Sequence, residues 1–123
     1  SSVDITPTIL DLLGFEIPAY VDGISQAPQI EDEGCDVRNA CMVEYRNGYD
    51  CDVNVNAIVK KEGKFIMYET GEQEYTDLAG DPEEKINAAK QEAYDEAVAE
   101  AAKSLLLERL RSKSKGSVQY GHA

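Results

Sequence analysis

The feature that most constrains the fold is a series of short segments, between residues 41 and 78, in which apolar and polar residues alternate. Such alternation is typical of strands that bury one face of a sheet. The clearest segment reads "VNVNAIVKK", because valine or alanine stands at every other position from Val53 to Val59. The predicted strands are residues 41–46, 53–61, 64–69 and 74–78.

Short turns separate the last three of these segments. Gly63 follows Glu62 and is expected to supply a positive φ in a hairpin turn, and Gly71 lies in the next turn. Because consecutive strands joined by short turns pair antiparallel, the sequence predicts a small antiparallel β-sheet of about four strands.

One long helix is predicted after the last strand. Asp81 is a suitable N-cap, Pro82 occupies the first helical position, and Glu84 stands three residues after the cap. Neither glycine nor proline follows until Gly116, and residues 116–123 are expected to be a frayed tail. Small or apolar residues recur at helical spacing, so this helix is expected to cover one face of the sheet. They are Ile86, Ala89, Ala93, Ala97, Ala101 and Leu105.

A much shorter helix is expected near the start of the chain. Thr6 would be its N-cap, Pro7 its first residue, and Gly14 its left-handed end. A helix of two turns that is this apolar needs a surface to pack on, because isolated helices shorter than about 12 residues are marginal in water.

The predicted fold class is α+β. A short N-terminal helix and a long loop precede the small antiparallel sheet, and one long C-terminal α-helix covers it. The predicted organisation is a segment at 1–25, an acidic loop at 26–40, an α+β subdomain at 41–115 and the tail at 116–123.

Composition excludes several classes of partner. The net charge of −12 argues against nucleic acid and against anionic membrane surfaces, and there is no apolar run long enough to span a bilayer. The sequence leaves two thiol states open, a Cys35–Cys41 bridge or free thiols, and it leaves the compartment open between cytoplasm and periplasm. With Cys51 and the single His122, these residues lack the paired spacing of a zinc site.

The sequence contains no recognisable catalytic motif. The candidate recognition cluster is "YRNGY" at 45–49, where Arg46 and Tyr49 could face an anionic ligand at a strand end. The alternative is that Tyr45 belongs to the core and that Arg46 pairs with a nearby carboxylate. The acidic loop lacks the spacing of an EF-hand, which favours a solvated loop over a calcium site.

Several motifs, taken in order, resemble the C-terminal part of the sulfatase family, within the alkaline-phosphatase-like superfamily. The first resembles the segment that closes the large catalytic domain, the next two resemble the first strand and the following hairpin of the C-terminal subdomain, and the last resembles the family's ending. They read "VDITPTILDLLGFEIPAYVDGIS" (3–25), "EYRNGY" (44–49), "NAIVKKEGKFIMYETGEQEY" (56–75) and "DLAGDPEEKINAA" (77–89).

The resemblance implies a non-catalytic C-terminal subdomain of a sulfuric ester hydrolase, which completes the enzyme fold and lines one side of the active-site cleft. It also implies that residues 1–25 pack on an N-terminal catalytic domain, and that Arg46 and Tyr49 are rim residues. The parent enzyme is expected to use calcium and a formylglycine residue. None of the three cysteines begins the C-x-P-S-R motif that would supply the formylglycine. The resemblance places the aspartate and asparagine ligands of calcium mainly in the large domain, so they have no counterparts here. Thr76 departs from the family, which commonly has tyrosine there.

Two other assignments are compatible with the same residues. The subdomain could belong to a phosphonate monoester hydrolase or phosphodiesterase of the same superfamily. It could also be a stand-alone interaction domain, which would hide its apolar helix by forming a homodimer. The sequence does not choose among aryl, choline and carbohydrate sulfates.

Overall fold

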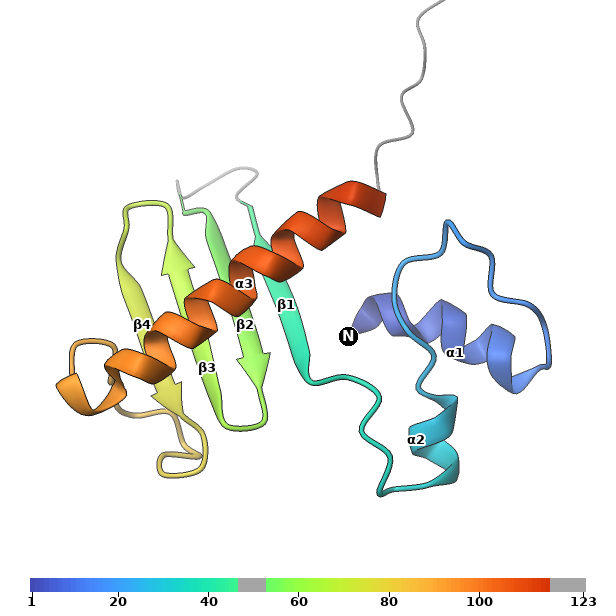
Figure 1. Cartoon of the computed structure of the whole chain (residues 1–123), viewed down its shortest axis with the longest axis horizontal. Helices are drawn as coiled ribbons and strands as arrows, with labels where there is room; N and C mark the ends of the chain where they lie inside the picture. The colour runs from blue at the N-terminus through green and yellow to red at the C-terminus, as the bar shows by residue number, and fades with distance from the viewer. Residues whose placement is uncertain (47–52, 116–123) are drawn as a thin grey trace, which may run out of the picture. The chain divides into compact units, whose positions relative to one another are not determined.

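The structure is a computed structural model that describes residues 1–46 and 53–115, with side chains to residue 112. It divides into two compact units, an N-terminal unit (Ser1–Asn39) and a C-terminal unit (Ala40–Ala123). The described part comprises two short helices in the first unit, and a four-stranded sheet with one long helix in the second (Figure 1). The predicted α+β class is confirmed.

The N-terminal unit begins with a 3-10 turn, Ser2–Asp4, that runs directly into α1 (Ile5–Leu12). The helix therefore starts earlier than the predicted cap at Thr6. This is possible because Pro7 still lies in the first turn, where its missing N–H would have had no intrahelical partner. Gly14, with φ of +73°, ends the helix as predicted.

A second helix in this unit, α2 (Ala27–Glu31), was not predicted. The sequence predicts an acidic loop over residues 26–40. Pro28 stands in its first turn, a position where the fixed φ of proline favours a helix. The helix spans five residues, which is too short to give a visible apolar period.

The C-terminal unit is built on an antiparallel sheet in the order β1-β2-β3-β4. Each observed strand overlaps a predicted one to within about two residues, so the sheet prediction is confirmed. The register places Val59 opposite Cys41, and Phe65 opposite both Ile58 and Tyr75. The strands are β1 (Ala40–Tyr45), β2 (Val55–Lys60), β3 (Gly63–Tyr68) and β4 (Gln73–Asp77).

The long helix α3 (Asp95–Lys115) lies across one face of the sheet (Figure 1). Phe65 is completely buried beneath it and Ile58 almost so. Small side chains on the helix allow this close approach, because an alanine face can lie nearer to a sheet than a leucine face. The buried core consists of Ile58, Phe65, Tyr75, Ala88, Ala101 and Leu105.

The predicted start of the long helix at Asp81 is wrong, because α3 begins at Asp95. Within the preceding segment, residues 87 and 88 instead bind the free edge of β4, and a 3-10 turn (Glu92–Tyr94) leads into α3. There the Tyr75 N–H donates to Asn87 Oδ1 at 3.1 Å, and Ala88 N donates to the Tyr75 carbonyl at 2.8 Å. Glu84 adopts a left-handed backbone with φ of +55° and interrupts any helix. Pairing with the strand edge thus prevails over a good local capping sequence.

The predicted role of Gly63 is also wrong, since positive φ occurs at Gly71 (+88°) but not at Gly63. Glycine is needed at position 63 because of a close approach. A Cβ there would lie 2.5 Å from the hydroxyl oxygen of Tyr75 and 2.9 Å from the carbonyl oxygen of Thr76.

Candidate functional site

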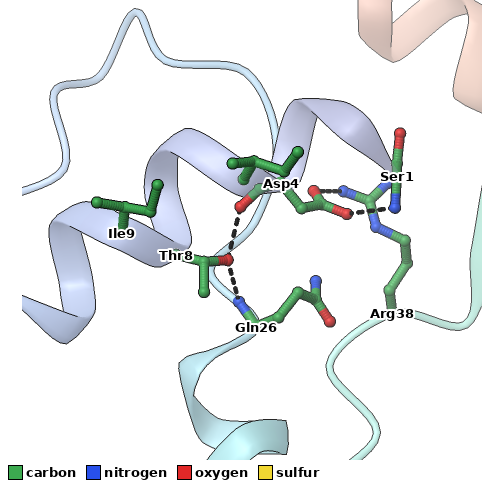
Figure 2. Close-up of a pocket in the computed structure, with 7 residues that line it drawn as sticks. Ser1, Asp4, Thr8, Ile9, Gln26 and Arg38 are labelled. Atoms are coloured by element: carbon green, nitrogen blue, oxygen red, sulfur yellow. Dashed lines mark hydrogen bonds and ion pairs between the residues drawn. The ribbon is translucent and has the colours of Figure 1, made fainter.

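The polar centre of the N-terminal unit is the carboxylate of Asp4, which is only 3% exposed. Its Oδ1 accepts a hydrogen bond from Ile24 N at 2.9 Å and pairs with the guanidinium of Arg38. Its Oδ2 lies 3.2 Å from the Ser1 ammonium. Figure 2 shows Arg38 and Ser1 converging on this carboxylate from different parts of the chain. Asp4 therefore joins the start of α1 to two later segments.

A second set of contacts fixes the loop after α1. The Thr8 hydroxyl donates to the Asp4 carbonyl at 2.6 Å and accepts from Gln26 N at 2.9 Å (Figure 2). Gly23 passes so close to the first turn that a Cβ would lie 2.2 Å from the Val3 carbonyl oxygen. Only glycine permits this approach, which accounts for the "DG" of the first motif.

These residues border an open pocket of about 320 Å³. One wall is polar, and the other consists of the half-exposed isoleucines of α1. Arg38 Nε is buried in this region without a hydrogen-bond partner among the described residues. The lining residues are Ser1, Asp4, Ile5, Thr8, Ile9, Gln26 and Arg38.

The protonation state of Asp4 follows from its surroundings. Burial by itself raises the pKa of this carboxyl. The hydrogen bond from Ile24 N–H, the Ser1 ammonium and the Arg38 guanidinium outweigh it, and they hold the pKa of Asp4 below its ordinary value. Asp4 is therefore ionised at neutral pH, and its negative charge holds the unit together through these contacts. An ionised carboxylate has no proton to donate, so Asp4 is not suited to act as a general acid.

Of the two predicted rim residues, Arg46 lies immediately after β1, and Tyr49 lies outside the described residues. The Arg46 side chain is 66% exposed, and its Nε pairs with Glu44. The alternative prediction that Arg46 pairs with a carboxylate is thus confirmed. The alternative that Tyr45 belongs to the core is wrong, since Tyr45 is 53% exposed.

A polar link on the covered face of the sheet was not predicted from the sequence. Arg109 Nη1 of α3 donates to Asn56 Oδ1 at 2.7 Å and lies 2.8 Å from Glu44 Oε1. The hydrogen bond from Arg109, with a smaller contribution from Arg46, holds the pKa of Glu44 below its ordinary value despite partial burial. Only the strand register brings Glu44 and Asn56 next to each other, so no local pattern indicates this link.

The "DLAGDPEEKINAA" motif forms a turn around Asp77. Its Oδ1 accepts hydrogen bonds from the N–H groups of Ala79 and Gly80, and its Oδ2 accepts one from the Tyr94 hydroxyl at 3.2 Å. The Gly80 N–H, helped by Tyr94 and Ala79, holds the pKa of Asp77 below its ordinary value. The motif thus links the end of β4 to the turn before α3.

No group of three or more histidine, cysteine or acidic side chains is placed to hold a metal within residues 1–46 and 53–112. Cys35 and Cys41 carry free thiols, whereas Cys51 and His122 lie outside the described residues. No helix in the described part of the chain is long and apolar enough to cross a membrane.

A four-stranded antiparallel sheet with one long covering helix, preceded by a short helical segment, places the chain in the class of small α+β domains. Residues 1–113 match the sequence model of the family described as N-sulphoglucosamine sulphohydrolase, C-terminal, and the chain belongs to this family.

Relatives and solved structures agree with this assignment. The chain is 32% identical over 114 residues to an arylsulfatase of Clostridium perfringens, covering 92% of this chain and 23% of that protein. It resembles the structure of a protein in complex with its substrate D-glucosamine-2-N,6-O-disulfate, with a TM-score of 0.79 and 26% identity. The match covers 95% of this chain and 25% of that protein. It also resembles the phosphonate monoester hydrolase of Agrobacterium radiobacter, with a TM-score of 0.67 and 27% identity. This match covers 88% of this chain and 24% of that enzyme. The chain thus spans about a quarter of the length of these relatives.

Proposed function

We propose that this chain is the non-catalytic C-terminal subdomain of a sulfuric ester hydrolase, where it completes the enzyme fold and lines one side of the active-site cleft. The observation that carries the proposal is the family match over residues 1–113, together with coverage of only about a quarter of each relative. The nucleophile would then come from the remaining three quarters of the parent polypeptide.

The proposed partner of the N-terminal unit is this catalytic portion. Helix α1 and the loop after it leave many large apolar side chains more than 40% exposed. Such a concentration on one short segment is unusual for a surface that meets only water. The exposed side chains are Val3, Ile5, Ile9, Leu12, Leu13, Phe15, Tyr20 and Ile24.

The proposed substrate rim is Arg46 with Tyr49. The exposure of Arg46 at a strand end supports this role, because a guanidinium can bind the oxygens of a sulfate or a sugar carboxylate in a bidentate manner. Its pairing with Glu44 leaves the other nitrogens of the guanidinium for a ligand.

Calcium and formylglycine, which the family resemblance assigns to the parent, do not fit the residues of this chain. None of Cys35, Cys41 and Cys51 starts a C-x-P-S-R motif, and no metal cluster occurs in the described residues. We therefore place both groups in the catalytic portion and derive no step through them here. The chain would contribute shape and charge at the cleft.

The test compares the parent enzyme with the 123-residue chain, each purified. Substrates would be an aryl sulfate, D-glucosamine-2-N,6-O-disulfate and a phosphonate monoester. The parent is expected to release sulfate, whereas the chain alone is expected not to exceed the protein-free blank. Turnover by the chain alone would overturn its non-catalytic role.

The rim assignment is tested in the parent with Arg46→Ala. We expect KM to rise at least fivefold with little change in kcat, since a rim residue contributes binding energy equally to ground and transition states. The control is Lys61→Ala, which removes an exposed cation from the turn between β2 and β3, at the opposite end of the sheet. Equal effects of both substitutions would contradict a specific role for Arg46.

A second candidate function follows from the phosphonate monoester hydrolase, whose fold this chain also matches. A parent that cleaves the phosphonate ester much faster than either sulfate would replace the sulfatase assignment. A stand-alone interaction domain would instead form a homodimer through α1. It is tested by sedimentation of the 123-residue chain over a range of concentrations.

A further inference from the structure

The outer side of α3, which faces away from the sheet, carries leucines that are about half exposed. On the inner side, Ala101 and Leu105 are buried against the strands (Figure 1). Leu106 and Leu107 follow directly and Leu110 comes one turn later, and these three are 59%, 43% and 57% exposed. A surface helix normally places polar residues on the side away from the core. The end of α3 is thus apolar on two opposite sides, and the strands pack on the inner one.

Two of these leucines belong to a regular stripe along the outer side of the helix. Its members follow one another at steps of four, three and four residues, which is the spacing of the seam along which helices pair in a coiled coil. The charged member in the middle is compatible with such a seam, because it fixes the register while its aliphatic stem packs. The stripe consists of Ala99, Lys103, Leu106 and Leu110, all of them exposed.

Charge is distributed unevenly along the same helix. Its first turn carries Asp95 and Glu96, both exposed, whereas the side chain of Arg111 near the other end is 71% exposed. Arg111 pairs with Glu108 of its own helix, and a guanidinium with five N–H donors is able to meet a carboxylate of another molecule as well. A helix with acidic residues at its start and a basic residue at its end is complementary to a copy of itself when the two run antiparallel.

The antiparallel arrangement aligns both the charges and the stripe. With the midpoints of the two helices near residue 104, Glu96 of one copy lies opposite Arg111 of the other, because each is about two turns from the midpoint. In the same register Leu110 lies opposite Ala99, where a small side chain leaves room for a large one. Two-fold symmetry makes each of these contacts occur twice.

We propose that a second copy of this chain binds the outer side of α3, antiparallel to the first, so that the parent protein is a homodimer. The occupant follows from the charge complementarity and from the fit of leucine on alanine, both of which one helix supplies to its copy. The inference goes beyond the proposed function and requires no particular reaction. The paired stretch, residues 95–111, is about 24 Å long. We expect a Kd on the order of 10 µM, because interfaces below about 1,200 Å² are weak.

Sedimentation velocity of the parent protein from about 1 to about 100 µM, a range that brackets this Kd, measures the equilibrium. We expect Glu96→Arg or Arg111→Glu alone to raise the Kd by about tenfold or more, since each places like charges opposite each other. The double variant exchanges the two charges and should restore the Kd to within about threefold of the wild type. Glu72→Arg makes the same change of charge between β3 and β4, and this control should leave the Kd unchanged.

Three results would contradict the pairing of α3. A wild-type parent that stays monomeric at about 100 µM would overturn it. A dimer that the single charge reversals leave intact joins through another surface, such as α1, and would overturn it as well. Circular dichroism of each variant reports whether α3 is still folded, and a folded double variant that stays monomeric would refute the antiparallel register.

A disulfide measures the register directly. Parent protein with Ala99→Cys is mixed with parent protein with Leu110→Cys under mild oxidation, and the products are mapped by mass spectrometry. We expect the 99–110 disulfide to exceed the 99–99 disulfide by about tenfold or more, since a two-fold axis near residue 104 brings unlike positions together. A majority of 99–99 product would indicate parallel helices and refute the proposal.

The same parent protein shows whether another part of its own polypeptide covers the helix. Leu106→Cys should be protected from maleimide above the Kd and should react freely well below it. Protection that persists on dilution would mean an intramolecular cover and would overturn the proposal.

Sulfate release by these samples keeps this inference apart from the proposed function. An active parent without a dimer would overturn the pairing of α3 alone. A dimer without any sulfate release would support the pairing and overturn the proposed function.

Discussion

Arg109 of α3 and Glu44 of β1 form an ion pair with 2.8 Å between Nη1 and Oε1, and the same nitrogen reaches Asn56 of β2. One guanidinium thereby ties the last turns of the helix to two neighbouring strands. The pair lies at the end of the sheet where β1 leads to Arg46, so the helix also fixes the strand end that carries the proposed rim residue.

Removing this link should destabilise the C-terminal unit. We expect Arg109→Met to lower the free energy of unfolding by about 1–2 kcal/mol, because a partly buried charged hydrogen bond is lost while the apolar stem is kept. Arg46→Met removes the other partner of Glu44, which is far more exposed, and should cost about 0.5 kcal/mol or less. Urea unfolding followed by circular dichroism measures both. Equal losses would contradict the link.

Asp4 should make the N-terminal unit sensitive to acid. The pKa of Asp4 in the folded chain lies below the ordinary value of 3.8. Its stabilisation of the folded state is therefore fully present above that value and is lost as the pH falls through the folded pKa. Asp4→Asn should reduce amide protection at Gln26 by about 3 kcal/mol at pH 5–7, and the gap to the wild type should shrink below about pH 4.

The measurement is amide hydrogen exchange by NMR, corrected for intrinsic rates. Glu16→Gln, an exposed carboxylate of the same unit, is the control and should leave Gln26 protected at every pH. A gap that stays constant down to pH 3 would contradict the assignment of the acid sensitivity to Asp4.

Core substitutions should have graded costs. We expect Ile58→Val to cost about 1 kcal/mol and Phe65→Ala about 4 kcal/mol, since both side chains are fully buried under α3 and each change leaves a cavity. Ile86→Val is the matched control, because Ile86 lies in the segment before α3 and is largely exposed. The Ile86→Val substitution should lower the free energy of unfolding by no more than about 0.5 kcal/mol. Thermal unfolding of the three variants gives the order, and an equal cost at Ile58 and Ile86 would be inconsistent with this core.

Two glycines should respond to alanine for different reasons. Gly63→Ala should cost about 2–3 kcal/mol, because its Cβ would overlap the Tyr75 hydroxyl and a backbone carbonyl. Gly71→Ala meets no atom within 4 Å and should cost only about 1 kcal/mol, from its positive φ. Adding Tyr75→Phe should recover part of the loss at Gly63 and none at Gly71. The absence of any recovery in urea unfolding would contradict the steric explanation.

The sequence by itself determined the sheet of this protein. Alternation and turn residues act between near neighbours, so the four strands and the turn at Gly71 could be predicted without tertiary information. The same holds for the later part of the long helix, where Ala97, Ala101 and Leu105 recur at helical spacing and do pack on the sheet. The ordered motifs also sufficed to indicate the sulfatase family.

Only the tertiary structure decided three other points. The segment before α3 binds the edge of β4 through Asn87 and Ala88, which satisfy the backbone of Tyr75, and the long helix therefore does not start at Asp81. Asp4 meets Arg38 across a long stretch of chain that no local pattern connects. The valines of β2 face away from α3, because alternation shows which residues share a face and leaves open which body covers it.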